Sequence, residues 1–301
     1  MNEKTFDVIV VGGGPAGLSA ALILGRMRRE VLLLDTAAPA NAVSNAMHGF
    51  LGQDGVPPAA VRQLAGDQLQ PYRSIERRTT AAVAGRRVAE GFEITLEHGG
   101  TVAGRRVLLA HGMRYGLPDL KGASELWGRS IFHCPYCHGW EVRDQTLAVH
   151  AGGPKAVHQA LLLHSLSDEV VFLAVGGELA GEDRARLQGA GVEIVEDPVE
   201  RLVEAEGGLR VEFTTGRDSL PRQALFIQPD LSLASDLGPA LGAALTPVGS
   251  IETNTSGETT VPGLYAAGDA GAEVQSVAVA TGGGARAAYA INTELALEEA
   301  R

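Results

Sequence analysis

Cys134 and Cys137 are the only two cysteines of the chain, and they enclose a Pro-Tyr dipeptide. Two thiols at this spacing can close into a small disulfide and reopen, which makes the pair a reversible two-electron switch. His133 and His138 flank the pair, and imidazoles carry protons near neutral pH. These residue types predict thiol-disulfide chemistry assisted by a neighbouring histidine.

Three other interpretations of the cysteines compete with redox chemistry. A structural zinc site draws four ligands from separated segments, whereas these two Cys and two His fall within six consecutive residues and no second CxxC exists. A structural disulfide across so short a loop would stabilise the fold little. Inert packing would leave the spacing unexplained. The other histidines show no HxxxH or HExxH spacing, so we expect no metal site.

Composition narrows the class of protein and its partners. The chain has 301 residues, of which 45% are hydrophobic and 39 are glycine, and this suits an α/β protein rich in glycine turns. A net charge of -11 argues against nucleic acid or an anionic membrane as a partner and favours a partner with a basic docking face. No apolar run is long enough for a membrane span, and the short polar N-terminus gives no secretory signal. We therefore expect a cytoplasmic protein, where a CxxC is more often catalytic than structural.

The start of the chain follows the order strand, glycine turn, helix, strand and acid. Its parts are the apolar run Phe6–Val11, the GxGxxG glycines Gly12, Gly14 and Gly17, a helical stretch from Leu18 to about Met27, the strand Val31–Leu34, and Asp35. Such glycines allow a tight turn, close approach of a pyrophosphate and close helix packing, and the helix N-terminus faces the negative charge. The acid falls where a ribose hydroxyl needs an acceptor. This order predicts a dinucleotide site for either FAD or NAD.

A second segment, near the C-terminus, favours FAD. A turn and a short apolar strand over residues 260–267 lead into Gly268-Asp269 and then into a helical stretch rich in Gly and Ala. An acid at the end of a strand can hold a ribityl hydroxyl, and the N-terminus of the next helix can stabilise negative charge on a reduced flavin ring.

With these motifs the chain resembles the low-molecular-weight thioredoxin reductases, which are two-domain FAD disulfide oxidoreductases, and the resemblance spans essentially the whole chain. Ala110-His111-Gly112 is similar to the family's linker motif, and Met47–Gly52 corresponds to its flavin-contacting loop. The cofactor-binding residues that the resemblance implies are Gly12, Gly14, Ala16, Gly17, Asp35, Gly49, Ala110, Gly112, Gly268, Asp269, Gln275 and Ser276.

The resemblance also implies the architecture. The expected fold is α/β, with two Rossmann-like, three-layer ββα nucleotide-binding domains, the second inserted in the first. The FAD-binding domain would comprise residues 1–116 and 245–301, and the central redox domain with the CxxC would comprise residues 117–244, with Pro118 and Pro247 near the crossings. Members of the family are homodimers that associate through the FAD domain, so we expect a homodimer.

The middle of the chain repeats the strand, turn, helix and strand of the first site in a degenerate form. The expected strands are Thr146–Val149 and Glu169–Leu173, and they enclose the turn Ala151–Ala156 and a helix to about Leu166. In the family this unit binds NADPH. Here Ala151 replaces the first glycine, and Pro154 removes a backbone N–H from the phosphate-binding turn.

The residues that would recognise NADPH are missing. Family members place a His-Arg-Arg set where this chain has Ala174-Val175-Gly176, so the guanidinium clamp for a 2′-phosphate is absent. Lys155 and the downstream Arg184 and Arg186 do not restore the pattern. The sequence therefore argues against efficient use of NADPH, and the unit is better explained as retained for shape and docking.

The resemblance assigns roles to the redox residues. It places the CxxC at a helix N-terminus, where the dipole favours a thiolate. Cys137 would face the flavin and Cys134 would exchange with the external disulfide. His138 stands where the family has an acidic Asp, and an imidazole can do the same proton transfer. CxxCHG with a damaged nicotinamide site resembles a branch that includes dithiol oxidases and reductases with other donors such as ferredoxin.

The leading hypothesis is an FAD-dependent thiol-disulfide oxidoreductase, whose default partner is a thioredoxin-like protein or a small dithiol or disulfide. One alternative is a dithiol oxidase that forms a disulfide and passes electrons to oxygen. A non-enzymatic alternative is a flavin-binding redox sensor or docking module whose CxxC only reports redox state. The residues leave the electron donor and the direction of the reaction open.

Overall fold

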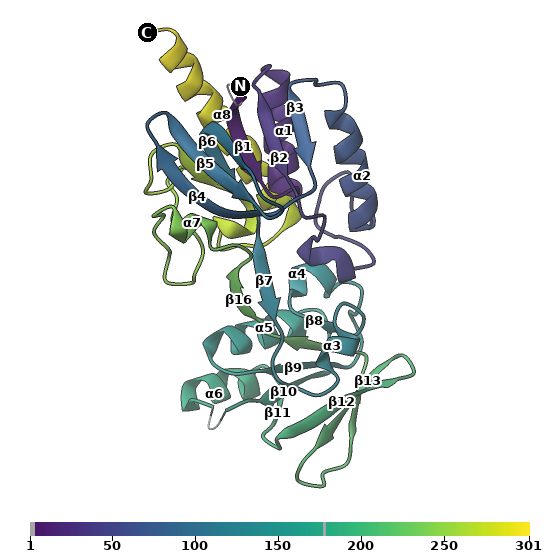
Figure 1. Cartoon of the computed structure of the whole chain (residues 1–301). Coiled ribbons are helices and arrows are strands. Elements are labelled where there is room, and N and C mark those ends of the chain that lie inside the picture. Colours follow the sequence, from purple (N-terminus) through teal and green to yellow (C-terminus); the bar gives the residue numbers. More distant parts are fainter. Residues whose placement is uncertain (1–3, 177–178) are drawn as a thin grey trace. The chain divides into compact units, whose positions relative to one another are not determined.

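The computed structural model describes residues 4–176 and 179–301 (Figure 1). Residue contacts divide the chain into two compact units. The first unit comprises the chain up to Ala42 together with Gly49–Arg114 and Leu231–Arg301, and the second comprises Val43–His48 and Tyr115–Asp230. The expectation about a secretory signal falls partly on residues 1–3, which lie outside the described residues.

A parallel sheet forms the centre of the first unit. Its order is β3 (Ile75–Arg78), β2 (Val31–Leu34), β1 (Thr5–Val11), β6 (Thr101–Leu109) and β17 (Leu264–Ala266). The inner strands β1 and β2 are nearly continuous apolar runs because both faces of the sheet are covered there. Side chains of one face, such as Val8 and Val10, pack in one core with helices α1 (Pro15–Arg26) and α8 (Val277–Glu299), and Leu69 of α2 (Pro58–Leu69) joins them.

The other face of this sheet carries a β-meander. Ile9 and Val11 of β1 share a core with Phe92 and Ile94 of β5 (Gly91–Leu96), which pairs antiparallel with β4 (Ala82–Val88), and with the short helix α7 (Leu237–Ala240). Strand β6 belongs to both layers, because its first half pairs with β5 and its last residues pair with β17. The first unit is therefore built of three layers.

The second unit repeats this plan. Its parallel sheet has the order β11 (Glu193–Val195), β10 (Val170–Ala174), β9 (Leu147–Ala151), β15 (Ala224–Ile227) and β8 (Ile131–Phe132). One face packs on α5 (Pro154–His164) and α6 (Gly181–Gly189). The other packs on α3 (Ala123–Leu126) and on the antiparallel strands β12 (Val199–Ala205), β13 (Gly208–Phe213) and β14 (Leu220–Arg222). This confirms the expected α/β class with two Rossmann-like layered domains.

The chain passes between the units along two short paired strands, β7 (Met113–Gly116) and β16 (Asp230–Leu233). From the last residue of β16 onward, Leu233, Leu237 and Ala243 enter the core of the first unit. The sequence-based division placed residues 231–244 in the inserted domain and residues 43–48 in the FAD-binding domain, so the contact units differ from it at these two segments. Pro247 lies after the crossing because apolar side chains that precede it already pack on the first sheet.

Within residues 4–176 and 179–301, no helix combines the length and the apolar character that crossing a membrane requires.

Candidate functional site

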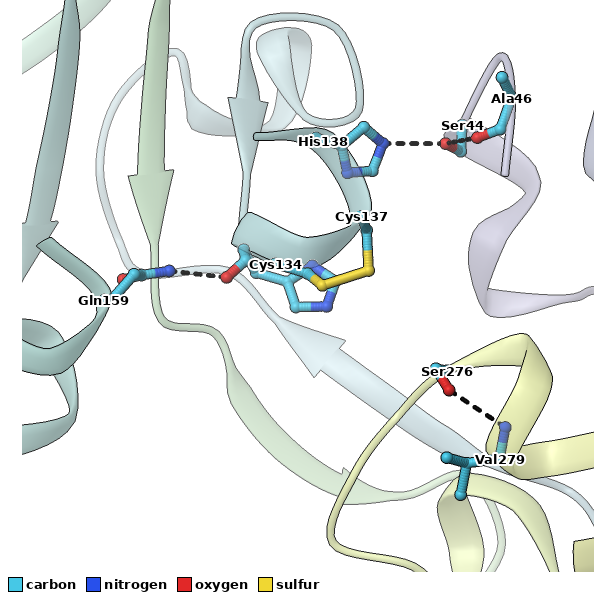
Figure 2. Close-up of a disulfide and its surroundings, with 9 residues drawn as sticks. Ser44, Ala46, Cys134, Cys137, His138, Gln159, Ser276 and Val279 are labelled. Atoms are coloured by element: carbon cyan, nitrogen blue, oxygen red, sulfur yellow. Dashed lines mark hydrogen bonds between the residues drawn. A yellow bond between two sulfur atoms is a disulfide. The ribbon is translucent and has the colours of Figure 1, made fainter. Parts of the chain in front are cut away.

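The two cysteines form a disulfide at the end of strand β8 in the second unit (Figure 2). Their Cα atoms are 5.2 Å apart, and the intervening residues form α4 (Pro135–His138), a single helical turn with Cys134 as its N-cap residue. The backbone N–H groups of Cys137 and His138 donate to the Cys134 carbonyl oxygen at 3.1 and 3.2 Å. One turn of helix thus places the disulfide and the following imidazole on the same short element.

His138 is packed rather than free in solvent. Its ring stacks on Phe132, with centroids 4.3 Å apart, and its Nε2 lies 3.1 Å from the hydroxyl oxygen of Ser44. Burial lowers the pKa of His138 to about 4, and the nearby His133 adds to this effect, while Glu141 opposes it. The imidazole is therefore neutral near pH 7, and a neutral imidazole can accept a proton from a thiol.

His133, on the other side of the disulfide, sits in an aromatic environment. Its ring centroid lies 5.6 Å from that of Trp127 and 4.9 Å from that of Tyr115. Burial lowers the pKa of His133 to about 4. Its carbonyl oxygen accepts a hydrogen bond of 2.6 Å from Nε2 of the buried Gln159 on α5 (Figure 2). This bond ties the backbone just before Cys134 to the helix that covers the sheet.

Two aromatic side chains close to the cysteines in sequence face solvent. Tyr136, between the cysteines, is 79% exposed, and Trp140 is 64% exposed with the guanidinium of Arg143 stacked 4.0 Å from its ring centroid. Aromatic side chains are enriched where another molecule docks.

In the first unit, the glycine turn between β1 and α1 has the geometry that the sequence predicts. Gly12 has φ +113°, and a Cβ there would overlap the carbonyl oxygen of Ala110. A Cβ on Gly17 would overlap the carbonyl oxygen of Gly12, so the helix and the turn are in backbone contact. A Cβ on Gly14, the N-cap residue of α1, would meet nothing within 4 Å. The N-terminus of α1 therefore opens onto free space, as an anion site requires.

The Gly-Asp segment packs beside this turn. Gly268 has φ +67°, and a Cβ there would lie 3.0 Å from the Cβ of Ala16. Asp269 lies in the 3-10 turn Gly268–Ala270 that follows β17. Ser276 is the N-cap residue of α8 and accepts a 3.1 Å hydrogen bond from the N–H of Val279 (Figure 2), and Gln275 donates to the carbonyl of Glu273.

Asp35 lies at the end of β2, beside the glycine turn. A Cβ on Gly13 would overlap the Asp35 side chain. Its Oδ2 accepts from Arg62 at 2.8 Å and its Oδ1 accepts from the N–H of Ala37 at 3.1 Å. Because each carboxylate oxygen has two acceptor positions, Asp35 can accept a further hydroxyl group while Arg62 stays in place.

The other predicted flavin-loop residues have local roles. Gly49 has φ +72°, and its N–H donates to Asp54 at 2.8 Å. The segment Met47–Gly52 is divided between the units, since Met47 and His48 pack with the second unit and Gly49 with the first. The side chain of His48 lies 3.5 Å from Glu141. Gly112 has φ +73°, and its carbonyl lies 3.0 Å from Nδ1 of His111.

Two polar atoms of the first unit test whether it fits FAD. The carbonyl of Gly112 only accepts, so Nδ1 of His111 carries the hydrogen and Nε2 is an acceptor in the neutral ring. Burial lowers the pKa of His111 and so favours this neutral form. Nε2 of His111 and the hydroxyl of Thr80 are buried without a hydrogen-bond partner in the described part of the chain. Buried polar groups are normally paired, so these atoms, with the open helix N-terminus, fit a ligand that carries phosphates and hydroxyls.

The glycine turn before α5 in the second unit is more similar to the turn before α1 than its sequence indicates. Pro154 is the first residue of α5, and Pro15 is the first residue of α1. Proline is favoured at this helix position because its missing N–H would be unpaired there. Pro154 therefore does not distinguish the second turn from the first. The differences that remain are Ala151 in place of Gly12, Lys155 in place of Ala16 and Ala156 in place of Gly17.

The end of β10 presents no guanidinium over the described residues Ala174–Gly176. Val175 is 45% exposed, and Gly176 has φ +80°. Downstream, Arg184 is paired with Glu196, and Arg186 lies 3.9 Å from Asp183. Lys155 is exposed in the first turn of α5. Both downstream arginines therefore already have acidic partners.

Sequence reasoning identified the disulfide, His138 and the glycine turns but missed Ser44, Gln159 and the aromatic neighbours of His133. Ser44 precedes the cysteines by ninety positions and carries no motif, so no sequence signal could have found it. In the described part of the chain, no group of three or more His, Cys, Asp or Glu side chains could hold a metal ion.

Comparison with known proteins agrees with this fold. The family model described as pyridine nucleotide-disulphide oxidoreductase matches residues 6–284, and the chain belongs to this family. Thioredoxin reductase sirT of Leptosphaeria maculans is 34% identical over 310 residues, which cover 95% of this chain and 93% of the relative. The chain is thus a thioredoxin reductase-like oxidoreductase.

Solved structures give the same result. The crystal structure of HlmI matches with a TM-score of 0.93 and 38% identity, covering 99% of this chain and 96% of that one. The structure of an oxidoreductase from Agrobacterium tumefaciens matches with a TM-score of 0.92 and 35% identity, covering 98% and 99%.

Proposed function

We propose that this protein is an FAD-dependent thiol-disulfide oxidoreductase that moves two electrons between FAD and the Cys134/Cys137 pair, and then exchanges them with a disulfide or dithiol partner. The observation that carries the proposal is the Cys134–Cys137 disulfide on the same helical turn as the neutral, buried imidazole of His138. From the family resemblance, Cys137 is assigned to face the flavin and Cys134 to exchange with the partner, which is a thioredoxin-like protein or a small dithiol.

The first unit supplies the binding site for FAD. The residues assigned to it are Gly12, Gly14, Ala16, Gly17, Asp35, Gly49, Ala110, Gly112, Gly268, Asp269, Gln275 and Ser276. The unpaired acceptor of His111, which lies between Ala110 and Gly112, joins this set. When bound, FAD supplies a two-electron centre that a dithiol can reduce or a disulfide can oxidise.

The thiol step can be written with its atoms and electrons balanced. In the direction of dithiol oxidation, His138 accepts the proton of an incoming thiol, and the resulting thiolate attacks a sulfur of the disulfide. The Cys134–Cys137 bond breaks, and the departing thiolate takes the proton from His138. Repetition with the second thiol forms the substrate disulfide and leaves two cysteine thiols, so two electrons have moved and no net proton is released. Reduction of a disulfide is the same sequence in reverse.

NADPH is not the electron source in this proposal. The second unit offers no guanidinium at Ala174–Gly176, and two charge-assisted contacts to a 2′-phosphate are worth roughly 1.5–3 kcal/mol each. Their absence weakens NADPH binding by at least about 100-fold. The electrons then come from another donor, such as a ferredoxin-like protein, or from the dithiol substrate itself.

The missing guanidinium groups at Ala174–Gly176 also support a second candidate function, that of a dithiol oxidase. A protein without a working nicotinamide site can still receive electrons from a dithiol at Cys134 and pass them through FAD to oxygen. The exposed Tyr136 and Trp140 give a small apolar dithiol a surface to contact.

The proposal is tested by anaerobic reduction of the FAD-loaded protein with NADPH, with NADH and with dithiothreitol, followed through flavin absorbance. Dithiothreitol is expected to bleach the flavin of the wild type, and NADPH to do so at least about 100-fold more slowly than it bleaches the flavin of an NADPH-using thioredoxin reductase. Cys137→Ser should abolish bleaching by dithiothreitol, and Cys134→Ser should slow it.

Each other outcome has a distinct meaning. Rapid bleaching by NADPH would contradict the claim that its site is degraded. Oxygen consumption with small dithiols that Cys137→Ser abolishes would favour the oxidase. If no donor reduces the flavin and both serine variants leave its spectrum unchanged, the protein is a flavin-binding sensor or docking module.

From the resemblance we also propose a homodimer in the cytoplasm. Sedimentation equilibrium tests the oligomeric state, and cell fractionation tests the localisation.

A further inference from the structure

Ser44 reaches the redox site from a distant part of the sequence. It precedes His138 by 94 positions and lies in Val43–His48, the segment that packs with the second unit. Its hydroxyl oxygen is 3.1 Å from Nε2 of His138 and 2.8 Å from the carbonyl oxygen of Ala46 (Figure 2). Ser44 thus joins the imidazole to a backbone carbonyl.

This arrangement determines which imidazole nitrogen carries the hydrogen. A serine hydroxyl has one hydrogen to donate, and a carbonyl oxygen can only accept. Ser44 therefore donates its hydroxyl hydrogen to the carbonyl oxygen of Ala46. Toward His138, the Ser44 oxygen can only accept a hydrogen bond. Nε2 must be the donor, which leaves the lone pair of the neutral ring on Nδ1.

Nδ1 is the ring nitrogen of His138 that stays unpaired among the described residues, and its burial shields it from bulk water. Nδ1 of His138 is buried and has no hydrogen-bond partner within the described ranges. Stacking on Phe132, with ring planes 15° apart, restricts rotation of the imidazole. The titratable groups that act on it are His133, His48 and Glu141. No other bond competes for the lone pair that Ser44 leaves on Nδ1.

We propose that Ser44 is a positioning residue that holds His138 in the Nε2–H tautomer, so that Nδ1 is the atom that accepts and returns the proton during thiol-disulfide exchange. This inference rests on the proposed function for the exchange step, but the tautomer itself is a property of the protein alone.

The direct test is nuclear magnetic resonance of the oxidised protein with ¹⁵N-labelled histidine at pH 7.5, where His138→Gln assigns the His138 signals. The wild type should show a protonated Nε2 and an unprotonated Nδ1. Ser44→Ala should give a mixture of tautomers, and Ser44→Thr, which keeps the hydroxyl, should restore the wild-type spectrum. Thermal unfolding of each variant checks that it is folded.

The functional test is single-turnover reduction of the Cys134–Cys137 disulfide by dithiothreitol. Ser44→Ala should lower the rate about tenfold, the effect of one lost hydrogen bond, and Ser44→Thr should recover most of it. His138→Gln is the matched comparison, because its amide can still donate to Ser44 but has no base. It should lower the rate by about 100-fold.

Three results would overturn the inference. The first is a proton on Nδ1 in the wild type. The second is a Ser44→Ala spectrum that equals that of the wild type. The third is a tautomer that changes in Ser44→Ala without a change in rate. Failure of the proposed function is distinguishable: dithiothreitol would then reduce the disulfide without reducing FAD, while the tautomer would still report on Ser44.

Discussion

Gly12 and Gly14 belong to one glycine motif, yet the structure gives them different tasks. At Gly12, φ is +113° and the backbone of Ala110 and His111 approaches so closely that a side chain cannot fit. At Gly14, φ is -78° and ψ is -176°, so any residue can adopt the backbone, and the space around it is open. Gly12 is required by the fold of the first unit, whereas the fold places no steric demand for glycine at position 14, where we propose that the cofactor binds.

This difference predicts opposite behaviour of two substitutions. Gly12→Ala should destabilise the cofactor-free protein by about 2 kcal/mol or more, because it adds both backbone strain and steric overlap. Gly14→Ala should change that stability by less than about 1 kcal/mol and should mainly weaken retention of FAD. The measurements are urea unfolding without cofactor and flavin fluorescence released from the purified holoprotein. Equal loss of stability in both variants would contradict the assignment.

At the scale of a single helix, α8 contains three consecutive residues of low helix propensity. Gly282, Gly283 and Gly284 follow one another inside this helix of 23 residues. Glycine in a helix interior costs about 1 kcal/mol relative to alanine. Close packing of α8 on α1 explains the glycine at position 284, because a Cβ there would overlap the carbonyl oxygen of Ala16 in α1. Gly282 has no such contact, because a Cβ would meet nothing within 4 Å.

The two glycines therefore form a matched pair. Gly284→Ala should destabilise the protein by about 1–3 kcal/mol through overpacking, because α1 and α8 must separate. Gly282→Ala should be neutral or stabilise it by up to about 1 kcal/mol through helix propensity. Urea unfolding followed by circular dichroism checks both. Destabilisation by Gly282→Ala would show that this surface has a contact partner.

At the scale of the whole molecule, the second unit buries three neutral histidines. Burial lowers the pKa values of His133, His138 and His150 to about 4 from an ordinary value of 6.5. In the unfolded chain these rings bind protons below about pH 6.5, whereas in the folded unit they remain neutral down to about pH 4. The unfolded state thus binds more protons in this window, and stability falls as the pH falls.

We therefore expect the second unit to lose stability between pH 6.5 and pH 4, on the order of 1 kcal/mol or more for each histidine. Both tryptophans, Trp127 and Trp140, lie in this unit, so their fluorescence during urea unfolding reports on it alone. His150→Gln should make the dependence on pH less steep because it removes one titrating group. Equal urea midpoints at pH 7.5 and pH 4.5 would refute the expectation.

Local signals explain which parts of this molecule could be predicted from its sequence. The run Phe6–Val11 is apolar throughout because the strand is covered on both faces, and such a run predicts a buried parallel strand without further information. The GxGxxG turn is similarly local, since strand, turn and helix are adjacent in the chain. The disulfide needed only two residues at a fixed spacing.

Other features depend on segments that the sequence does not connect. By residue contacts the second unit ends at Asp230 and not near Pro247, because Leu233 and Leu237 pack in the core of the first unit. The sequence does not show this, because an apolar side chain can pack in either core. Pro154 was interpreted as damage to a nucleotide site, although it takes the same helix position as Pro15. In both cases the structural role of a residue depends on its neighbours in space.

The sequence by itself determined the type of chemistry, because a CxxC beside a histidine and a glycine turn between strand and helix are short-range patterns that operate within a few residues. Only the tertiary structure decided the surroundings of the histidine. The Ser44 hydroxyl, the Phe132 ring and the buried surroundings act together on His138, and they come from segments that only folding brings together. Tautomer and pKa are properties of that environment, and no residue type encodes them alone.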